Sequence, residues 1–124
     1  MATRHVSTRT EVRRGVTVLF VSGEVDLAGS PHLERALAEA AGPGAPLVVD
    51  LTGVEFIDSA GLRALTQAEL TVARLGGRLL IVPSPAAARV FEITSLVDAF
   101  ERRADLDAAL DEVAADCAPA EAAD

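Results

Sequence analysis

The chain has 124 residues, half of which are hydrophobic, and a formal net charge of −8 at pH 7. This acidic balance disfavours binding to nucleic-acid phosphates, and the absence of Trp and Tyr disfavours base stacking. The chain contains no Lys, which excludes a Walker A loop, a Schiff base and other lysine-dependent phosphate chemistry in this chain alone.

The first part of the chain predicts a hairpin followed by a helix. Residues 9–14 alternate loosely, Gly15 marks a turn, and residues 16–21 are rich in β-branched side chains, so we expect two paired strands. Ser30-Pro31 then combines a helix cap with proline at the first helical position. Residues 42–44 end this helix, whose apolar stripe consists of Leu33, Ala36, Leu37 and Ala40.

The rest of the chain alternates strands and helices. Residues 47–51 are almost continuously apolar, as in a central strand that is buried on both faces, and residues 78–82 are similar. The helix between them starts near Ser59 and carries at helical spacing Leu62, Leu65, Ala68, Val72 and Leu75. Ser84-Pro85 opens a third helix, and residues 99–102 predict a short last strand. Asp105 caps a fourth helix, whose inward residues are Leu106, Ala109, Leu110 and Val113.

This alternation predicts a single α/β domain with a mixed, mostly parallel β-sheet, an antiparallel hairpin at its start and about four helices. We expect the domain to cover residues 8–115, after a flexible N-terminus at residues 1–7. Residues 116–124 are rich in Ala, Pro and acidic side chains, which predicts a disordered tail.

The single cysteine, Cys117, excludes an internal disulfide and a multi-cysteine metal site. The N-terminus lacks the apolar stretch of a signal peptide, and no apolar run approaches the ~18 residues of a membrane span. We therefore expect a cytoplasmic protein without a metal or other cofactor.

Ser59 stands where an apolar run stops and a helix begins, and two interpretations are open for it. The simpler interpretation is a helix N-cap, worth about 1 kcal/mol. Asp58 can supply that cap instead, which would leave Ser59 at the first helical position with its hydroxyl beside the free amides of the helix end. The small residues Ala60 and Gly61 would then leave the hydroxyl open to a bulky partner.

The rest of the sequence does not support a catalytic role for Ser59. A nucleophile elbow requires Gly-x-Ser-x-Gly, and Ile57 occupies the first glycine position. The histidines, His5 and His32, both precede Ser59, whereas the hydrolase order places the histidine after the serine. The aspartates Asp26, Asp50 and Asp58 all lie at or just past strand ends, as in a phospho-accepting receiver domain, which would need an acidic pair and a late lysine. Asp26 has no acidic neighbour within two positions except Glu24, and the chain contains no Lys, so a receiver domain is not expected.

Five motifs follow one another along the chain: Gly23-Glu24-Val25-Asp26, Ser30-x-x-Leu33, residues 47–51 (Leu-Val-Val-Asp-Leu), residues 56–62 (Phe-Ile-Asp-Ser-Ala-Gly-Leu) and residues 89–96 (Arg-Val-Phe-Glu-Ile-Thr-Ser-Leu). In this order they resemble the STAS domain family, and most of all its stand-alone bacterial anti-sigma factor antagonists. The likeness covers about residues 8–113, and its most specific part is Asp-Ser-x-Gly-Leu.

The resemblance implies partner switching without catalysis. In that family the serine directly after the aspartate, here Ser59, is phosphorylated by a protein-kinase anti-sigma factor of the histidine-kinase-like ATPase type. The unphosphorylated form binds the anti-sigma factor and frees the sigma factor, and a PP2C-type phosphatase restores it. Two positions depart from the common pattern, because Ala60 stands where many members have Ser or Thr and Arg63 where many have Gly.

The expected partner surface surrounds the phosphorylation site and comprises Asp26, Asp58, Ser59, Ala60, Gly61, Arg63 and Gln67. A phosphate of roughly −2 charge would bring a desolvation cost to this surface and repulsion from both aspartates. The alternative is a non-switching STAS scaffold or small-ligand-binding module of a signalling complex, in which Ser59 is only a cap.

Overall fold

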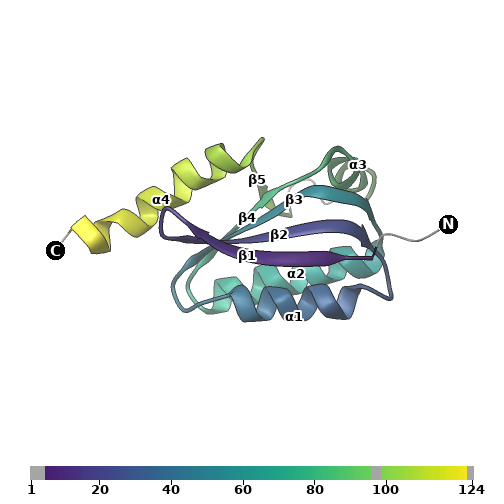
Figure 1. Cartoon of the computed structure of the whole chain (residues 1–124), viewed down its shortest axis with the longest axis horizontal. Coiled ribbons are helices and arrows are strands. Elements are labelled where there is room, and N and C mark those ends of the chain that lie inside the picture. The colour runs from purple at the N-terminus through teal and green to yellow at the C-terminus, as the bar shows by residue number, and fades with distance from the viewer. Residues whose placement is uncertain (1–4, 96–98, 123–124) are drawn as a thin grey trace.

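Five strands form one mixed sheet in the computed structural model, which describes residues 5–95 and 99–122 and, of their side chains, those up to residue 114. Leu96, at the end of the last motif, lies outside these residues. The strands are β1 (Ser7–Arg13), β2 (Val16–Val25), β3 (Pro46–Ile57), β4 (Arg78–Val82) and β5 (Glu101–Arg102). They lie in chain order across the sheet, with β1 antiparallel to β2 and every other pair parallel (Figure 1). The predicted fold class is therefore confirmed.

The hairpin between β1 and β2 has the two-residue turn that a twisted antiparallel pair favours. Arg13 pairs with Val16, and the two residues between them, Arg14 and Gly15, have positive φ angles of 54° and 76°. Two consecutive left-handed residues are the signature of a type I′ turn, whose twist matches that of the strands. Gly15 adopts this conformation without strain, as the sequence predicts.

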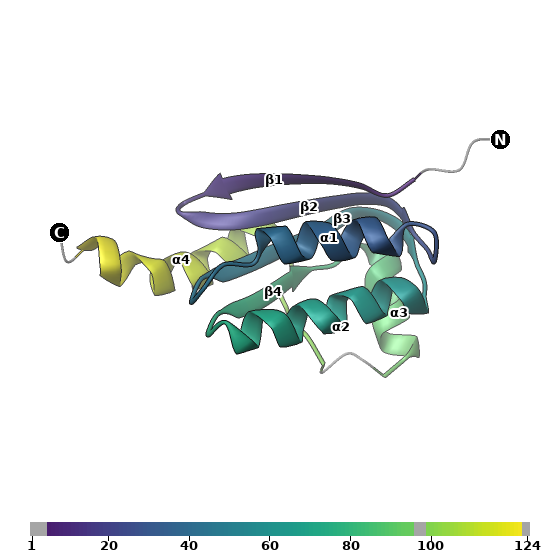
Figure 2. The ribbon, with the colours of Figure 1, turned by 90° about the horizontal axis from the view of Figure 1, so that it is seen from below.

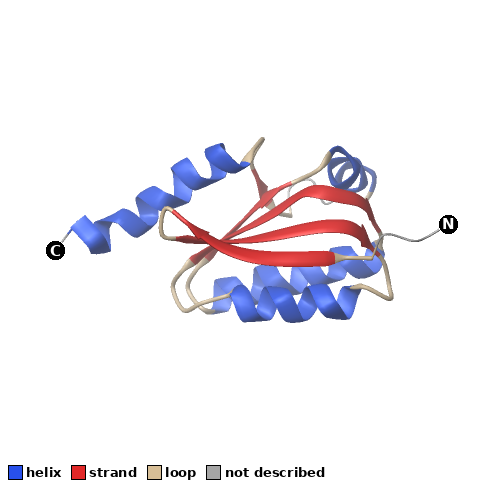
Figure 3. Ribbon diagram, viewed as in Figure 1, coloured by secondary structure: helices blue, strands red, loops and turns tan. Residues whose placement is uncertain are grey.

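The helices cover the two faces of the sheet unequally (Figures 2 and 3). Helices α1 (Ser30–Ala40) and α2 (Ser59–Arg74) lie side by side on one face, and α4 (Leu106–Ala122) crosses one end of the other. Helix α3 (Pro85–Ile93) packs against β3. The pairing of β3 with β4 ends at Asp50 and Val82, and β3 continues beyond that pair.

Alternating residues of the central strands contribute their side chains to two separate cores, because successive side chains of a strand point to opposite faces. Leu19, Val49 and Ile81 face α1 and α2, whereas Val18, Val48 and Leu80 face α4. The predicted apolar stripes are buried at most positions, including Leu33 and Leu37 on α1 and on α2 Leu62, Leu65, Ala68 and Val72. On α4 the predicted Ala109, Leu110 and Val113 are buried.

Three local predictions need correction. Gly29, not Ser30, caps α1, because Ser30 turns its hydroxyl back to the carbonyl of Leu27 at 3.2 Å. The strand predicted at residues 47–51 extends to Ile57, because β2 continues to Val25 and pairs with it there. Leu75 is partly exposed, since it follows the last helical residue of α2.

The predicted boundaries of the domain stay predictions, and two observations concern them. Val6 packs against the core and Ser7 begins β1, so regular structure starts within the N-terminal segment expected to be flexible. Helix α4 includes residues through Ala122 and thus most of the segment for which the composition predicts disorder. No helix among the described residues is long and apolar enough to cross a membrane.

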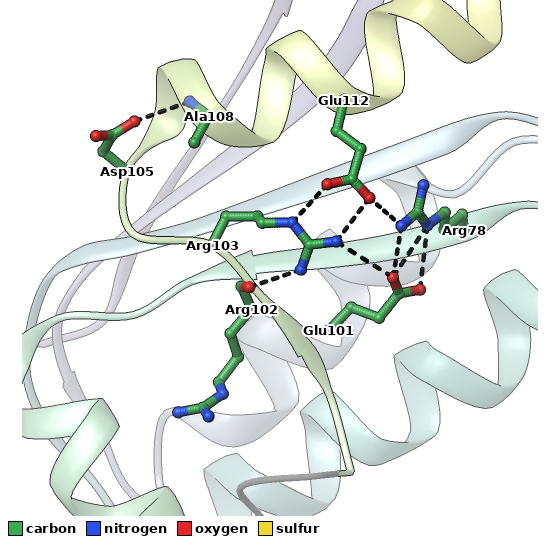
Figure 4. Close-up of polar contacts among 7 residues, drawn as sticks. All are labelled: Arg78, Glu101, Arg102, Arg103, Asp105, Ala108 and Glu112. Carbon is green, nitrogen blue, oxygen red and sulfur yellow. Dashed lines mark hydrogen bonds and ion pairs between the residues drawn. The ribbon is translucent and has the colours of Figure 1, made fainter.

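A cluster of four charged side chains joins α4 to β4 and β5 at the edge of the sheet (Figure 4). Arg78 on β4 binds Glu101 on β5 at 2.6 Å and also contacts Glu112 on α4. Arg103 donates to both carboxylate oxygens of Glu112, each at 2.6 Å. Hydrogen bonds from Arg103 and Arg78 hold the pKa of Glu112 at about 2, below its ordinary value.

Candidate functional site

The candidate site lies at the carboxyl ends of β2 and β3, where the helices that follow these strands begin. The amide of Asp58 donates a hydrogen bond to the carbonyl oxygen of Val25 at 3.1 Å, so the end of β3 is attached to the end of β2. Carboxyl ends of parallel strands are the usual place for functional loops in α/β sheets. This contact brings the two predicted aspartates, Asp26 and Asp58, to the same edge.

Asp58 is the N-cap of α2. Its carboxylate oxygen Oδ1 accepts hydrogen bonds from the amides of Ala60 at 2.9 Å and Gly61 at 3.2 Å. Ser59 is the first helical residue, and it is exposed. The predicted division of roles is thus confirmed in its structural part, because Asp58 caps the helix and Ser59 is left with an exposed side chain.

Ala60 and Gly61 are the buried residues that directly follow the exposed Ser59 in the first turn of α2. Ala60 is 8% exposed, and Gly61 is buried against the ends of both strands. A Cβ atom on Gly61 would lie 2.6 Å from Ile57 Cγ1 and 2.8 Å from Val25 Cγ1, closer than carbon atoms approach. Glycine therefore allows the first turn of α2 to pack directly on the strands, which fixes the position of Ser59 above it.

Asp26 organises the neighbouring turn between β2 and α1. Its side chain accepts a hydrogen bond from the amide of Gly29 at 2.9 Å, and its carbonyl accepts from the amides of Gly29 and Ser30. Like Asp58, it uses its carboxylate to hold the start of a helix. Both aspartates of the expected partner surface therefore have structural roles, and both remain half-buried.

Arg63 and Gln67 follow Ser59 on α2 at intervals of four residues, which places the three side chains along one side of the helix. All three are exposed. Arg63 and Gln67 also line a groove of about 420 Å³ between α1 and α2, together with Glu34, Leu37, Ala38, Ala41, Ala64, Ala68 and Thr71. The expected surface thus continues from Ser59 into a groove with an apolar floor.

The sequence alone did not reveal this groove or two exposed apolar residues at the same edge. Leu27, directly after Asp26, is 74% exposed, and Phe56, close before Asp58, is 48% exposed. Their signal in the sequence is weak, because single exposed apolar residues are common on protein surfaces. Both lie near the carboxyl ends of β2 and β3, where they add exposed apolar surface that a partner protein can bury.

The arrangement around Ser59 lacks the parts of a hydrolytic site. Within the described residues, no histidine is hydrogen-bonded to Ser59; His32 instead contacts the hydroxyl of Thr8 at 3.0 Å. The described part of the chain also contains no cluster of three or more His, Cys, Asp or Glu side chains that could hold a metal ion. What the geometry offers is an exposed hydroxyl on a fixed backbone.

A second hollow, of about 460 Å³, lies among β1, β2 and β3 and is lined by Phe20, Ser22, Asp50 and Thr52, among others. Asp50 is only 5% exposed, and its Oδ1 atom accepts hydrogen bonds from the amide and the hydroxyl of Thr52. This aspartate does not join Asp26 and Asp58 in one acidic site, since its backbone pairs with Phe20, well before the strand ends.

Comparisons with known proteins agree with this geometry. Residues 7–112 match the STAS domain family. The anti-sigma-F factor antagonist RsfB of Mycobacterium tuberculosis is 49% identical over 53 residues, which are 41% of this chain and 43% of RsfB. The match thus spans less than half of that relative.

Solved structures share the fold, among them the following two. The crystal structure of an anti-sigma factor antagonist from Mycobacterium paratuberculosis is 33% identical, with a TM-score of 0.77 over 90% of this chain and 97% of that one. The phosphorylated form of the Bacillus cell fate determinant SpoIIAA is 23% identical, with a TM-score of 0.64 over 86% and 99% of the two chains. At that identity the second likeness concerns the fold alone.

Proposed function

This chain belongs to the STAS domain family, and from that premise we propose that it is an anti-sigma factor antagonist that acts by partner switching on Ser59. The unphosphorylated protein binds an anti-sigma factor that is also its serine kinase, with a histidine-kinase-like ATPase fold, and so releases a sigma factor. Phosphorylation of Ser59 abolishes the binding, and a PP2C-type phosphatase restores it. The chain acts by binding and has no catalytic activity of its own.

The observation that carries this proposal is the position of Ser59. The residue is exposed at the first position of α2, directly after the aspartate that caps the helix. A kinase can reach the hydroxyl without unfolding the helix, because Asp58, not Ser59, makes the capping bonds. The names of relatives such as RsfB, an anti-sigma factor antagonist, support the same class of partner.

The proposed partner surface has direct and indirect members. Ser59, Arg63 and Gln67 are exposed and would contact the anti-sigma factor. Asp26, Asp58, Ala60 and Gly61 hold the two helix starts in place. A phosphate on Ser59 adds about two negative charges beside these aspartates, so repulsion and desolvation would weaken binding by orders of magnitude.

The decisive experiment measures phosphorylation and binding together. We expect incubation with the cognate kinase and ATP to add one phosphate to the wild-type protein and none to Ser59→Ala, as read by intact mass. Ser59→Ala should bind the anti-sigma factor like the wild type, and Ser59→Asp at least ten-fold more weakly. Thr10→Asp, which adds the same charge on the exposed edge strand β1, is the control. Equal affinity of Ser59→Ala and Ser59→Asp would exclude the electrostatic switch.

The alternative function is a non-switching STAS module that binds a small ligand. The observation in its favour is the hollow beside Asp50, whose volume of about 460 Å³ lies in the range of small-molecule sites. This alternative predicts that the kinase leaves Ser59 unmodified. It also predicts that substitutions of Asp50 impair signalling more than substitutions of Ser59. A cytoplasmic location is expected for either function and stays a prediction.

A further inference from the structure

Ser59 and Arg63 are one helical turn apart on the exposed side of α2. Residues at this spacing have Cβ atoms about 5–6 Å apart, and the Cα–Cβ bonds of a helix tilt toward its N-terminus, which for Arg63 is the direction of Ser59. An acidic group four residues before a basic one is also the favourable order on a helix. The helix geometry therefore brings a guanidinium within reach of any group attached to Ser59.

Three of the four free backbone amides at this helix end are already in use. A helix leaves its first four amides without a partner of its own, here those of Asp58, Ser59, Ala60 and Gly61. The amide of Asp58 donates to the carbonyl of Val25, and those of Ala60 and Gly61 donate to the Asp58 carboxylate. A phosphate on Ser59 would have to displace that carboxylate to use the amides of Ala60 and Gly61, which leaves it the amide of Ser59 itself. Its remaining acceptor oxygens therefore need side-chain donors.

Arg63 is free to supply them. No hydrogen bond or ion pair joins Arg63 to another described residue, whereas Arg78 and Arg103 are held by carboxylates. Binding a phosphate would thus cost Arg63 no existing partner. We propose that the phosphate on Ser59 is bound by the guanidinium of Arg63 in the same chain, an inference that rests on the proposed phosphorylation of Ser59.

This pair extends the switch into the groove between α1 and α2. Of the residues that line the groove, Arg63 and Glu34 are the charged ones. When the phosphate draws the guanidinium to Ser59, the groove keeps the negative charge of Glu34 and loses its cation. An acidic group of the partner that meets Arg63 in the unphosphorylated state then loses its counterion. Phosphorylation therefore acts at the serine and one turn away from it.

The experiment uses the full chain with phosphoserine inserted at position 59 during translation, so that no kinase is required. The second pKa of the phosphate is measured by ³¹P NMR as a function of pH. In the protein with Arg63 we expect this pKa to be lower by roughly half a unit or more than in Arg63→Gln, because a nearby cation favours the doubly charged phosphate. In addition, the Arg63 Nε–H signal should shift on phosphorylation.

Arg74→Gln is the matched control, because it removes the same charge from the same helix. Arg74 lies eleven residues after Arg63, about 17 Å along the axis, and should leave the phosphate pKa unchanged. An equal pKa in the wild type and in Arg63→Gln would overturn the inference. Failure of the proposed function gives a different result, since it would appear as absent phosphorylation by the kinase while the pKa difference in the phosphoserine protein persists.

Discussion

The amide of Asp58 donates a hydrogen bond to the carbonyl oxygen of Val25 across 3.1 Å, and this contact joins the ends of two neighbouring parallel strands. Val25 is followed by Asp26 and the start of α1, and Asp58 is followed by Ser59 and the start of α2. This backbone contact, at the end of the pairing of β2 with β3, therefore helps to set the relative position of the two helix starts. Substitutions of Asp58 and Gly61 test how much this junction contributes to the stability of the fold.

Asp58→Ala should destabilise the fold by about 1 kcal/mol, within a range of roughly 0.5–2 kcal/mol, because two amides of α2 lose their acceptor. Urea unfolding followed by circular dichroism measures this change. Asp58→Asn is the control, since asparagine caps helices about as well as aspartate. If Asp58→Ala and Asp58→Asn were equally stable, the carboxylate would not be the cap that holds Ser59 in place.

Gly61→Ala should destabilise the protein by about 1–3 kcal/mol, although alanine favours a helix over glycine by about 1 kcal/mol. The reason is steric, because the new methyl group would lie 2.6 Å from Ile57 and 2.8 Å from Val25. Gly42→Ala is the matched control, with 3.7 Å to its nearest neighbour, and should change the unfolding free energy little. A stabilised Gly61→Ala protein would show that the contact relaxes without cost.

The charged cluster around Glu112 should make stability depend on acid pH. Hydrogen bonds from Arg103 and Arg78 lower the pKa of Glu112 from 4.5 to about 2 in the folded state. A carboxyl group whose pKa is lowered in the folded state contributes stability at pH values above its unfolded pKa of 4.5. This contribution is lost as the pH falls from 4.5 toward about 2. The urea midpoint of the wild type should therefore fall more steeply across this range than that of Glu112→Gln.

Glu39→Gln is the control, because it removes an exposed carboxylate on α1, outside the cluster. We expect the urea midpoint of Glu39→Gln to change with pH as that of the wild type does. Added salt should reduce the difference between wild type and Glu112→Gln, because the side chains of the cluster are partly exposed and surface charges are screened. Identical pH curves for Glu112→Gln and wild type would contradict a stabilising role for the cluster.

Phe91→Ala should cost about 3–5 kcal/mol, because Phe91 is fully buried and its ring centroid lies 5.4 Å from that of Phe100. The truncation would leave a cavity between α3 and the sheet. Ile93→Ala on the same helix is the control, since Ile93 is 74% exposed and should change stability by less than about 0.5 kcal/mol. Comparable losses for the two variants in denaturant unfolding would contradict the packing of α3 described above.

Much of the local structure could be predicted from the sequence, because its causes lie within a few residues. Ser84 caps α3 through the amide of Ala87, as Ser84-Pro85 predicts, and Asp105 accepts from the amide of Ala108 at the start of α4. Capping is a short-range exchange between one side chain and nearby amides. The prediction at Ser30 failed for an equally local reason, since the carbonyl of Gly29 already accepts the amides of His32 and Leu33 that a Ser30 cap would use.

The functional site divides in the same way. The sequence by itself determined that Asp58 can cap α2 and that Ser59 would then be left at its first position, since both follow from adjacent residues. Only the tertiary structure decided that Gly61 packs on Val25, that Arg63 faces a groove beside α1, and that Glu112 binds arginines on β4 and beyond β5. These contacts join residues distant in the chain, and their partners are chosen by how the helices pack on the sheet, which no local pattern encodes.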